Sequence, residues 1–203
     1  MTRPNVQLVV CDELRADHVG FGGSALVETP NLDRLAARGR VFERAHVANP
    51  ICMPNRASML TGRAPSAHGL ADNSGALAWS TNTFVRSLRA AGYRTAHVGK
   101  ADQQNGLRRA LGDTEVTTPA PLGDPYEPGW DTWEDPQRYV DGTPEGPDDF
   151  YGYAHLALTI GHADMVAGHH LRWALEQGAD ADDLRHGGPK YFPSDAQCGD
   201  CRE

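Results

Sequence analysis

Short apolar runs and segments of helical periodicity alternate over the first half of the chain. Residues 7–11 (QLVVC) form an apolar run bounded by polar residues, which predicts a buried strand. Residues 29–39 predict a helix with Pro30 in its first turn and Gly39 closing it. Residues 41–47 are again strand-like. The pattern therefore predicts strand, helix and strand in that order.

The same alternation continues up to residue 98. Residues 54–60 predict a short helix that ends at Gly62. Another helix is predicted to begin after a cap at Asn82 or Thr83, and residues 94–98 predict the next strand. This order of elements is typical of an α/β domain with a mostly parallel sheet, which we place at residues 1–116.

The remaining chain changes character twice. Residues 117–149 hold seven of the fourteen prolines, which predicts a long excursion or lid rather than core. Residues 150–178 return to a helical pattern and are rich in histidine. Residues 179–203 are polar and aperiodic, which predicts a poorly ordered tail.

Composition narrows the possible partners and compartment. The net charge of −8 and the pI near 5.5 argue against nucleic acid, because a duplex binder needs a basic footprint. The four cysteines do not form a disulfide-rich secreted pattern. The apolar run before Asp12 is too short for a signal peptide or a membrane span, so we expect a cytoplasmic protein without a membrane partner.

Two adjacent acids, Asp12 and Glu13, directly follow the first predicted strand. Ligands of open α/β sheets bind at the carboxyl ends of the strands. Paired carboxylates there suit a hard divalent cation, which prefers several oxygen donors. A solvated acidic turn is the alternative, and these two residues alone favour it.

Residues 52–63 (CMPNRASMLTGR) place Cys52 just before the helix that starts at Pro54. The unpaired N–H groups and the dipole of a helix N-terminus stabilise an anion there. Arg56, one turn into the helix, is suited to hold a sulfate or phosphate oxygen by paired hydrogen bonds. A buried structural cysteine beside a helix is the alternative.

This segment resembles the signature of sulfatases, C-x-P-S-R followed by three residues and L-T-G-R, apart from Asn55 in place of Ser. The resemblance implies the alkaline-phosphatase-like α/β sandwich. It also implies that a formylglycine-generating enzyme oxidises the Cys52 thiol to an aldehyde, which hydrates. One hydroxyl then attacks the sulfur of a sulfate ester, the alcohol leaves, and loss of the second hydroxyl's proton expels sulfate.

The resemblance also implies a metal site and assigns ligands to it. In the family a divalent ion serves as Lewis acid and template. The implied ligands are Asp12, Glu13 and the modified Cys52, although Glu13 departs from the usual Asp-Asp or Asp-Gln pair. Ca²⁺ is the expected ion, with Mn²⁺ or Mg²⁺ as alternatives.

A third segment, residues 92–100 (GYRTAHVGK), resembles the family pattern G-Y-x-T-x-x-x-G-K. Its lysine, here Lys100, is implied to contact the nucleophile and the charged oxygens of the substrate. Asp102 stands where the family usually has a histidine. A carboxylate at this substrate-binding position would repel sulfate unless it is paired or protonated.

Two weaker patterns lie toward the C-terminus. The histidine-rich segment predicts a helix on which His162 and His169 share a face, and its members are His155, His162, Asp164, His169 and His170. Metal binding there is the less favoured alternative to a pocket rim or structural hydrogen bonding. The pair Cys198 and Cys201 (CGDC) predicts two free thiols rather than a redox or zinc site.

The sequence thus predicts a sulfuric ester hydrolase of the arylsulfatase type acting on a small sulfate ester. A phosphonate monoester or phosphodiester hydrolase of the same superfamily is one alternative. A non-catalytic remnant or binding module is another. The resemblance covers residues 4–178. It also implies further metal ligands and a second lysine, and these do not occur in these 203 residues. We therefore expect the N-terminal portion of a longer enzyme.

Overall fold

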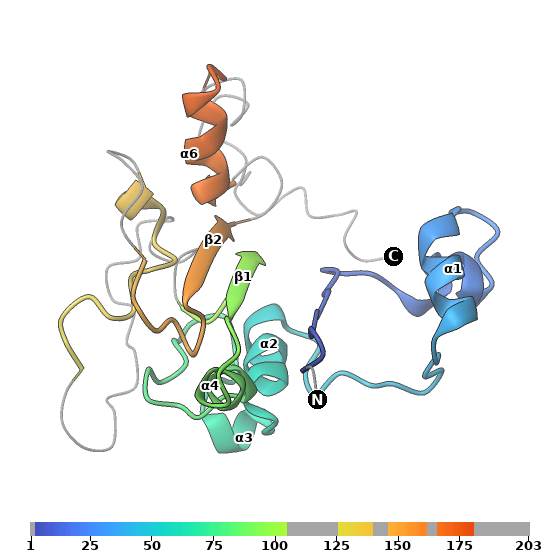
Figure 1. The fold of residues 1–203 in the computed structure, drawn as a ribbon, viewed down its shortest axis with the longest axis horizontal. Coiled ribbons are helices and arrows are strands. Elements are labelled where there is room, and N and C mark those ends of the chain that lie inside the picture. The colour runs from blue at the N-terminus through green and yellow to red at the C-terminus, as the bar shows by residue number, and fades with distance from the viewer. Residues whose placement is uncertain (1–2, 105–125, 140–145, 162–165, 181–203) are drawn as a thin grey trace, which may run out of the picture. The chain divides into compact units, whose positions relative to one another are not determined.

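The computed structural model describes residues 3–104, 126–139, 146–161 and 166–180 (Figure 1). The chain divides into two compact units, Met1–Val47 and Ala48–Glu203. We call them the N-terminal unit and the C-terminal unit and describe each by itself.

The N-terminal unit contains the 3₁₀ turns η1 (Ala16–His18) and η2 (Gly20–Gly22) and the helix α1 (Pro30–Arg38). Two polar side chains at the start of α1 hold η2. The Thr29 hydroxyl accepts from the Gly20 N–H at 2.8 Å, and the Asp33 carboxylate accepts from the Phe21 N–H at 2.8 Å. The predicted helix at residues 29–39 is therefore confirmed.

The two strands predicted in this unit are not formed. Residues 7–11 and 41–47 adopt no strand, and apolar side chains in the first run stay in contact with solvent, with Val9 73% exposed. An apolar run becomes a strand only when a neighbouring strand takes its backbone hydrogen bonds and a core covers its side chains. The N-terminal unit provides neither to these residues in its described part.

The C-terminal unit is built around a three-stranded sheet in the order β1-β2-β3. β1 (Ala96–Gly99) pairs parallel with β2 (His155–Ile160), and β2 pairs antiparallel with β3 (Ala167–Gly168). The helices are α2 (Cys52–Thr61), α3 (Pro65–His68), α4 (Phe84–Ala90) and α6 (His169–Glu176), with a 3₁₀ turn η3 (Pro136–Tyr139). The α/β prediction is confirmed, with a mixed sheet.

One hydrophobic core joins these elements. Its members come from α2, α4 and α6, from η3, from β2 and β3, and from the loops between these elements. Those with 2% exposure or less are Ala57, Leu77, Val85, Phe150, Tyr151, Leu158 and Ala167. Burial of such side chains stabilises the fold by roughly 1.5–3 kcal/mol each. The core therefore fixes α2 and α4 relative to β2, and β1 is held by its parallel pairing with β2, which matters for the site below.

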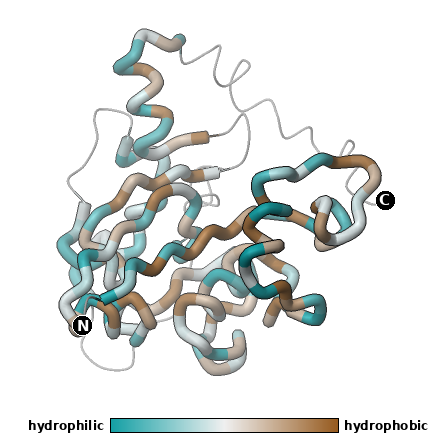
Figure 2. Tube along the Cα trace, turned by 45° about the vertical axis from the view of Figure 1, so that its right-hand side comes forward, coloured by the Kyte–Doolittle hydropathy of each residue, from teal (hydrophilic) through white to brown (hydrophobic). Residues whose placement is uncertain are grey.

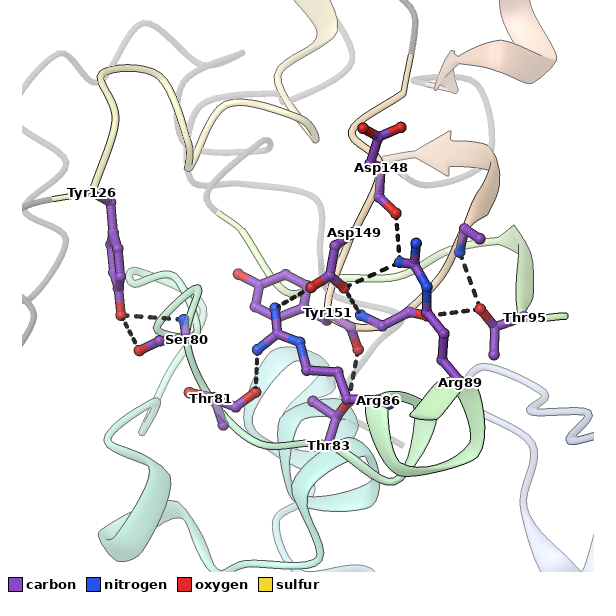
Figure 3. Close-up of polar contacts among 12 residues, drawn as sticks. Ser80, Thr81, Thr83, Arg86, Arg89, Thr95, Tyr126, Asp148, Asp149 and Tyr151 are labelled. Carbon is purple, nitrogen blue, oxygen red and sulfur yellow. Dashed lines mark hydrogen bonds and ion pairs between the residues drawn. The ribbon is translucent and has the colours of Figure 1, made fainter. Parts of the chain in front are cut away.

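Helix α4 is fastened to the turn before β2 by polar contacts (Figure 3). The Thr83 hydroxyl caps the helix by accepting from the Arg86 N–H at 3.1 Å, and it donates to the Tyr151 carbonyl at 2.7 Å. The Arg86 guanidinium pairs with Asp149 at 3.2 Å. Gly152, at φ +105°, lies so close to α4 that a Cβ there would be 2.5 Å from the backbone nitrogen of Arg86. Of the two caps predicted, Thr83 is the one used.

Replacing Thr83 by alanine is expected to lower the free energy of unfolding by about 2 kcal/mol, because it removes a cap and leaves a buried carbonyl unpaired. Thr83→Ser keeps both hydrogen bonds and is the matched control. Urea denaturation measures the difference. Equal losses in the two variants would show that the methyl group, not the hydroxyl, stabilises this junction.

The helical pattern predicted for residues 150–178 is wrong over its first half. Residues 155–160 form β2, in which Leu156, Leu158 and Ile160 are buried and the residues between them are not. That alternation has the period of a strand. His169 begins α6 directly after β3, so no helix connects it to His162, which lies outside the described residues.

The proline-rich segment does not stand apart from the core in its described part. Glu134 and Tyr139 are each 3% exposed, and Tyr139 belongs to the core cluster. The domain boundaries at residues 116, 149 and 178 stay predictions. The predicted tail lies outside the described residues from residue 181 onward.

Hydrophobic residues occur in short stretches separated by hydrophilic ones along the trace (Figure 2). Among the residues that the structure describes, no helix has both the length and the apolar character needed to cross a membrane.

Candidate active site

The N-terminus of α2 carries the candidate nucleophile. The helix begins at Cys52, two residues earlier than predicted, because Pro54 fits in a first turn that needs no N–H from it. Cys52 is half-buried and has a free thiol. The Met53 N–H donates to the Asn73 side-chain oxygen at 3.1 Å, which caps the helix from a distant loop. Gly62, at φ 67°, ends the helix as predicted.

Three charged side chains meet beside α2. The Arg56 guanidinium donates to the Lys100 carbonyl oxygen at 2.8 Å, which ties α2 to the residues that follow β1. The Lys100 ammonium lies 3.2 Å from the Asp102 carboxylate, and Arg56 Nε lies 3.8 Å from the same oxygen. The structure therefore brings together three of the residues predicted from the sequence, Arg56, Lys100 and Asp102.

These three charges are largely withdrawn from solvent. The side chains of Arg56, Lys100 and Asp102 are 12%, 13% and 20% exposed. Buried charges are tolerated when they are paired and hydrogen-bonded. Asp102 is paired with both cations, which is one of the two conditions under which the sequence predicts that it does not repel an anion.

Two residues near this cluster were not identified from the sequence. His97 on β1 has its pKa lowered, mainly by burial and in part by the charge of Arg56. Glu134 accepts hydrogen bonds from the backbone that carries Asp102. No local sequence pattern distinguishes His97 or Glu134, because a histidine inside a strand and an acid in a proline-rich loop are ordinary surface residues in most proteins.

A histidine–serine pair stiffens α2 on its buried side. His68 Nε2 lies 2.9 Å from the Ser58 hydroxyl, and His68 Nδ1 accepts from the Leu70 N–H at 3.2 Å. Since Nδ1 is an acceptor, the proton of the neutral ring is on Nε2, and His68 is not a base for Ser58. Burial lowers the pKa of His68, which favours this neutral form. The pair is structural.

Asp12 and Glu13 lie in a turn of the N-terminal unit, where Glu13 takes a positive φ of 55°. Their oxygen donors fit a hard divalent cation in type. Two carboxylates do not complete its coordination, and the described residues contain no group of three or more His, Cys, Asp or Glu that could hold a metal ion. The joint ligation by Asp12, Glu13 and Cys52 stays a prediction.

The histidine-rich segment has a structural role where it is described. His169 Nδ1 accepts from the Leu158 N–H at 3.1 Å, and its ring lies edge-on to Tyr139 with centroids 5.1 Å apart. This contact is in accord with the structural hydrogen bonding favoured from the sequence. His162, Asp164, Cys198 and Cys201 lie outside the described residues.

The arrangement is suited to a tetrahedral oxyanion. The N-terminus of α2 supplies the positive end of the helix dipole, the Arg56 guanidinium belongs to the same helix, and the Asp102 carboxylate links it to the Lys100 ammonium. A modifiable cysteine is the first residue of the same helix. The fold and the site define an α/β protein with paired cationic side chains beside a helix N-terminus, an arrangement that suits an anionic group.

The chain belongs to the sulfatase family, whose family model matches residues 4–140. It is similar to an arylsulfatase of Clostridium perfringens, with 39% identity over 99 residues, 48% of this chain and 21% of that protein. An N-acetylglucosamine-6-O-sulfatase of Bacteroides thetaiotaomicron is 31% identical over 139 residues, 68% of this chain and 25% of that protein. The human steryl-sulfatase is 37% identical over 110 residues, 49% of this chain and 19% of that protein.

A solved structure supports the fold. The chain is similar to the crystal structure of Ps i-CgsB with a TM-score of 0.54 and 24% identity, over 89% of this chain and 34% of that one. The expected alkaline-phosphatase-like fold is confirmed for the part that this chain covers. The chain spans about a fifth to a quarter of the length of the curated relatives named above.

Proposed function

We propose that the protein, in its full length, hydrolyses sulfate esters, with a formylglycine made from Cys52 as the nucleophile. The observation that carries this proposal is the convergence of Arg56 and Lys100 beside the helix that Cys52 begins. Family membership and the names of the relatives support the same reaction.

Each residue of the cluster has a distinct proposed role. Arg56, on the same helix as Cys52 and one turn further along, orients a sulfate oxygen through its planar donors. Lys100 stabilises negative charge on the nucleophile and on the sulfate oxygens. Asp102 is the counter-ion of both cations, and the substrate has to share them with it.

A divalent ion is part of this proposal, with Ca²⁺ first and Mn²⁺ or Mg²⁺ next. Asp12, Glu13 and the modified Cys52 would hold it together with ligands from elsewhere in the full-length protein. When bound, such an ion supplies Lewis-acid stabilisation of developing negative charge. The expected maturation partner is a formylglycine-generating enzyme, and the expected substrate is a small sulfate ester.

The test is a comparison of two chromogenic esters on the full-length protein, matured in its native host. We expect an aryl sulfate to be hydrolysed with a kcat/KM at least about tenfold above that of the matching aryl phosphonate, equivalent to about 1.4 kcal/mol in the transition state. The reverse preference would assign the protein to phosphonate hydrolysis. Absence of both activities would reject a catalytic role.

A further inference from the structure

Glu134 is a buried acid that joins the proline-rich segment to the candidate active site. Its Oε1 accepts from the Asp102 N–H at 2.6 Å, and its Oε2 accepts from the N–H groups of Gln103 and Gln104 at 2.7 and 2.8 Å. The residue is 3% exposed. One side chain thus holds three consecutive backbone N–H groups, which begin two residues after Lys100.

The backbone held in this way is strained. Asp102 takes a φ of 52°, a left-handed conformation that a non-glycine residue rarely adopts without support. The turn places the Asp102 carboxylate beside the Lys100 ammonium and Arg56. A relaxed turn would move both Lys100 and Asp102, because the contacts of Glu134 begin at the nitrogen of Asp102 itself.

Further hydrogen bonds hold the segment that carries Glu134 against the turn. The Gln104 side chain donates to the Trp130 carbonyl at 2.9 Å and accepts from the Trp133 N–H at 2.8 Å. The Tyr139 hydroxyl donates to the Trp133 carbonyl at 2.9 Å. The segment that carries Glu134 is therefore anchored on both sides of it.

We propose that Glu134 is a positioning residue, which holds the turn after Lys100 so that the Lys100 ammonium and the Asp102 carboxylate stay at Arg56. The three N–H groups compensate the hydration that the buried carboxyl group loses, so the turn and Glu134 stabilise each other. Burial and the charge of Asp102 raise the pKa of Glu134 to about 8, and the three N–H groups act in the opposite direction.

Lysine labelling tests this proposal without any need for turnover. The chain contains only two lysines, Lys100 and Lys190, so the second serves as an internal reference. The full-length protein and its Glu134→Gln variant are treated with an amine-reactive acylating reagent, and the labelled fraction at each lysine is read by mass spectrometry. Glu127→Gln, which changes an exposed acid of the same segment, is the matched control.

The amide of the Gln variant keeps one acceptor oxygen and turns an N–H₂ group toward the backbone donors. We therefore expect labelling of Lys100 relative to Lys190 to rise by about tenfold in Glu134→Gln, as local opening becomes easier, and to stay unchanged in Glu127→Gln. Equal labelling of Lys100 in the wild type and in Glu134→Gln would overturn the proposal.

A kinetic measurement separates positioning from general stability, and this part rests on the proposed sulfatase function. We expect kcat/KM for the aryl sulfate to fall by about 10- to 100-fold in Glu134→Gln, mostly through kcat, since a misplacement of about 1 Å has effects of that size. Amide exchange of residues 155–160 should remain as in the wild type. A rise in labelling with unchanged kcat would also overturn the positioning role.

A second variant and the labelling ratio separate the positioning role of Glu134 from a general loss of stability and from failure of the proposed function. If Glu134→Gln loses protection at residues 155–160, Glu134→Asp decides the matter, with intermediate labelling expected because its carboxylate is one methylene short. If the wild type hydrolyses no sulfate ester, the proposed function fails, while the labelling ratio still decides whether Glu134 positions Lys100.

Discussion

Replacement of Cys52 by alanine in the full-length protein is expected to lower aryl sulfate hydrolysis on the order of 10⁴-fold or more, because the nucleophile is removed. Cys52 is the first residue of α2, at the positive end of the helix dipole. Turnover of a chromogenic aryl sulfate measures the loss. Mass spectrometry of the tryptic peptide 45–56 is expected to show an aldehyde in the wild type.

The matched control for this variant is Cys11→Ala. Cys11 is the other free thiol that the structure describes, and it is exposed in the N-terminal unit. Turnover is expected to survive in this control. Turnover that persists in Cys52→Ala, or a peptide that carries only the unmodified thiol in a host with other active sulfatases, would contradict the proposed chemistry.

Replacement of Lys100 by alanine is expected to lower kcat/KM for the same substrate by about 10²- to 10³-fold, which is the usual effect of removing one donor to developing negative charge. Lys100 is 13% exposed and pairs with Asp102 at 3.2 Å, so its ammonium works in a partly dehydrated site. Lys190→Ala, at the other lysine of these 203 residues, is the matched control. A loss of less than about twofold would place Lys100 outside the reaction.

Asp102→Asn removes the negative member of the ion pair between Lys100 and Asp102. It removes the carboxylate that lies 3.2 Å from the Lys100 ammonium and 3.8 Å from Arg56, and it leaves both cations in place. Competition for the cations is then relieved, so KM for the aryl sulfate is expected to fall. A higher KM would mean that Asp102 contributes to substrate binding through its charge.

Sequence patterns predicted the helices of this protein better than its strands. Gly62 and Thr83 mark a helix end and a helix start, and both roles are confirmed. These signals depend on a few neighbouring residues, through a left-handed glycine or a hydroxyl three positions before an N–H group. The strands depend on partners elsewhere in the chain, which explains why residues 7–11 are unpaired here and β2 was mistaken for a helix.

The candidate site shows the same division. Two motifs, one with Cys52 and Arg56 and one with Lys100, are each a continuous stretch of the chain. They therefore indicated the family and the chemistry without a structure. The contact between Arg56 and Lys100 joins residues 44 positions apart, and that between Glu134 and Gln103 joins residues 31 positions apart. Contacts over such separations leave no periodic trace along the chain.

What the residues alone established is therefore local: the start and end of α2, the cap of α4, and the sulfatase signature that begins at Cys52. Tertiary structure decided the rest. It paired Asp102 with two cations and recruited Glu134 from a loop with no distinctive pattern. The physical reason is that capping and turn formation depend on adjacent residues, whereas pairing of buried charges depends on which distant segments the core brings together.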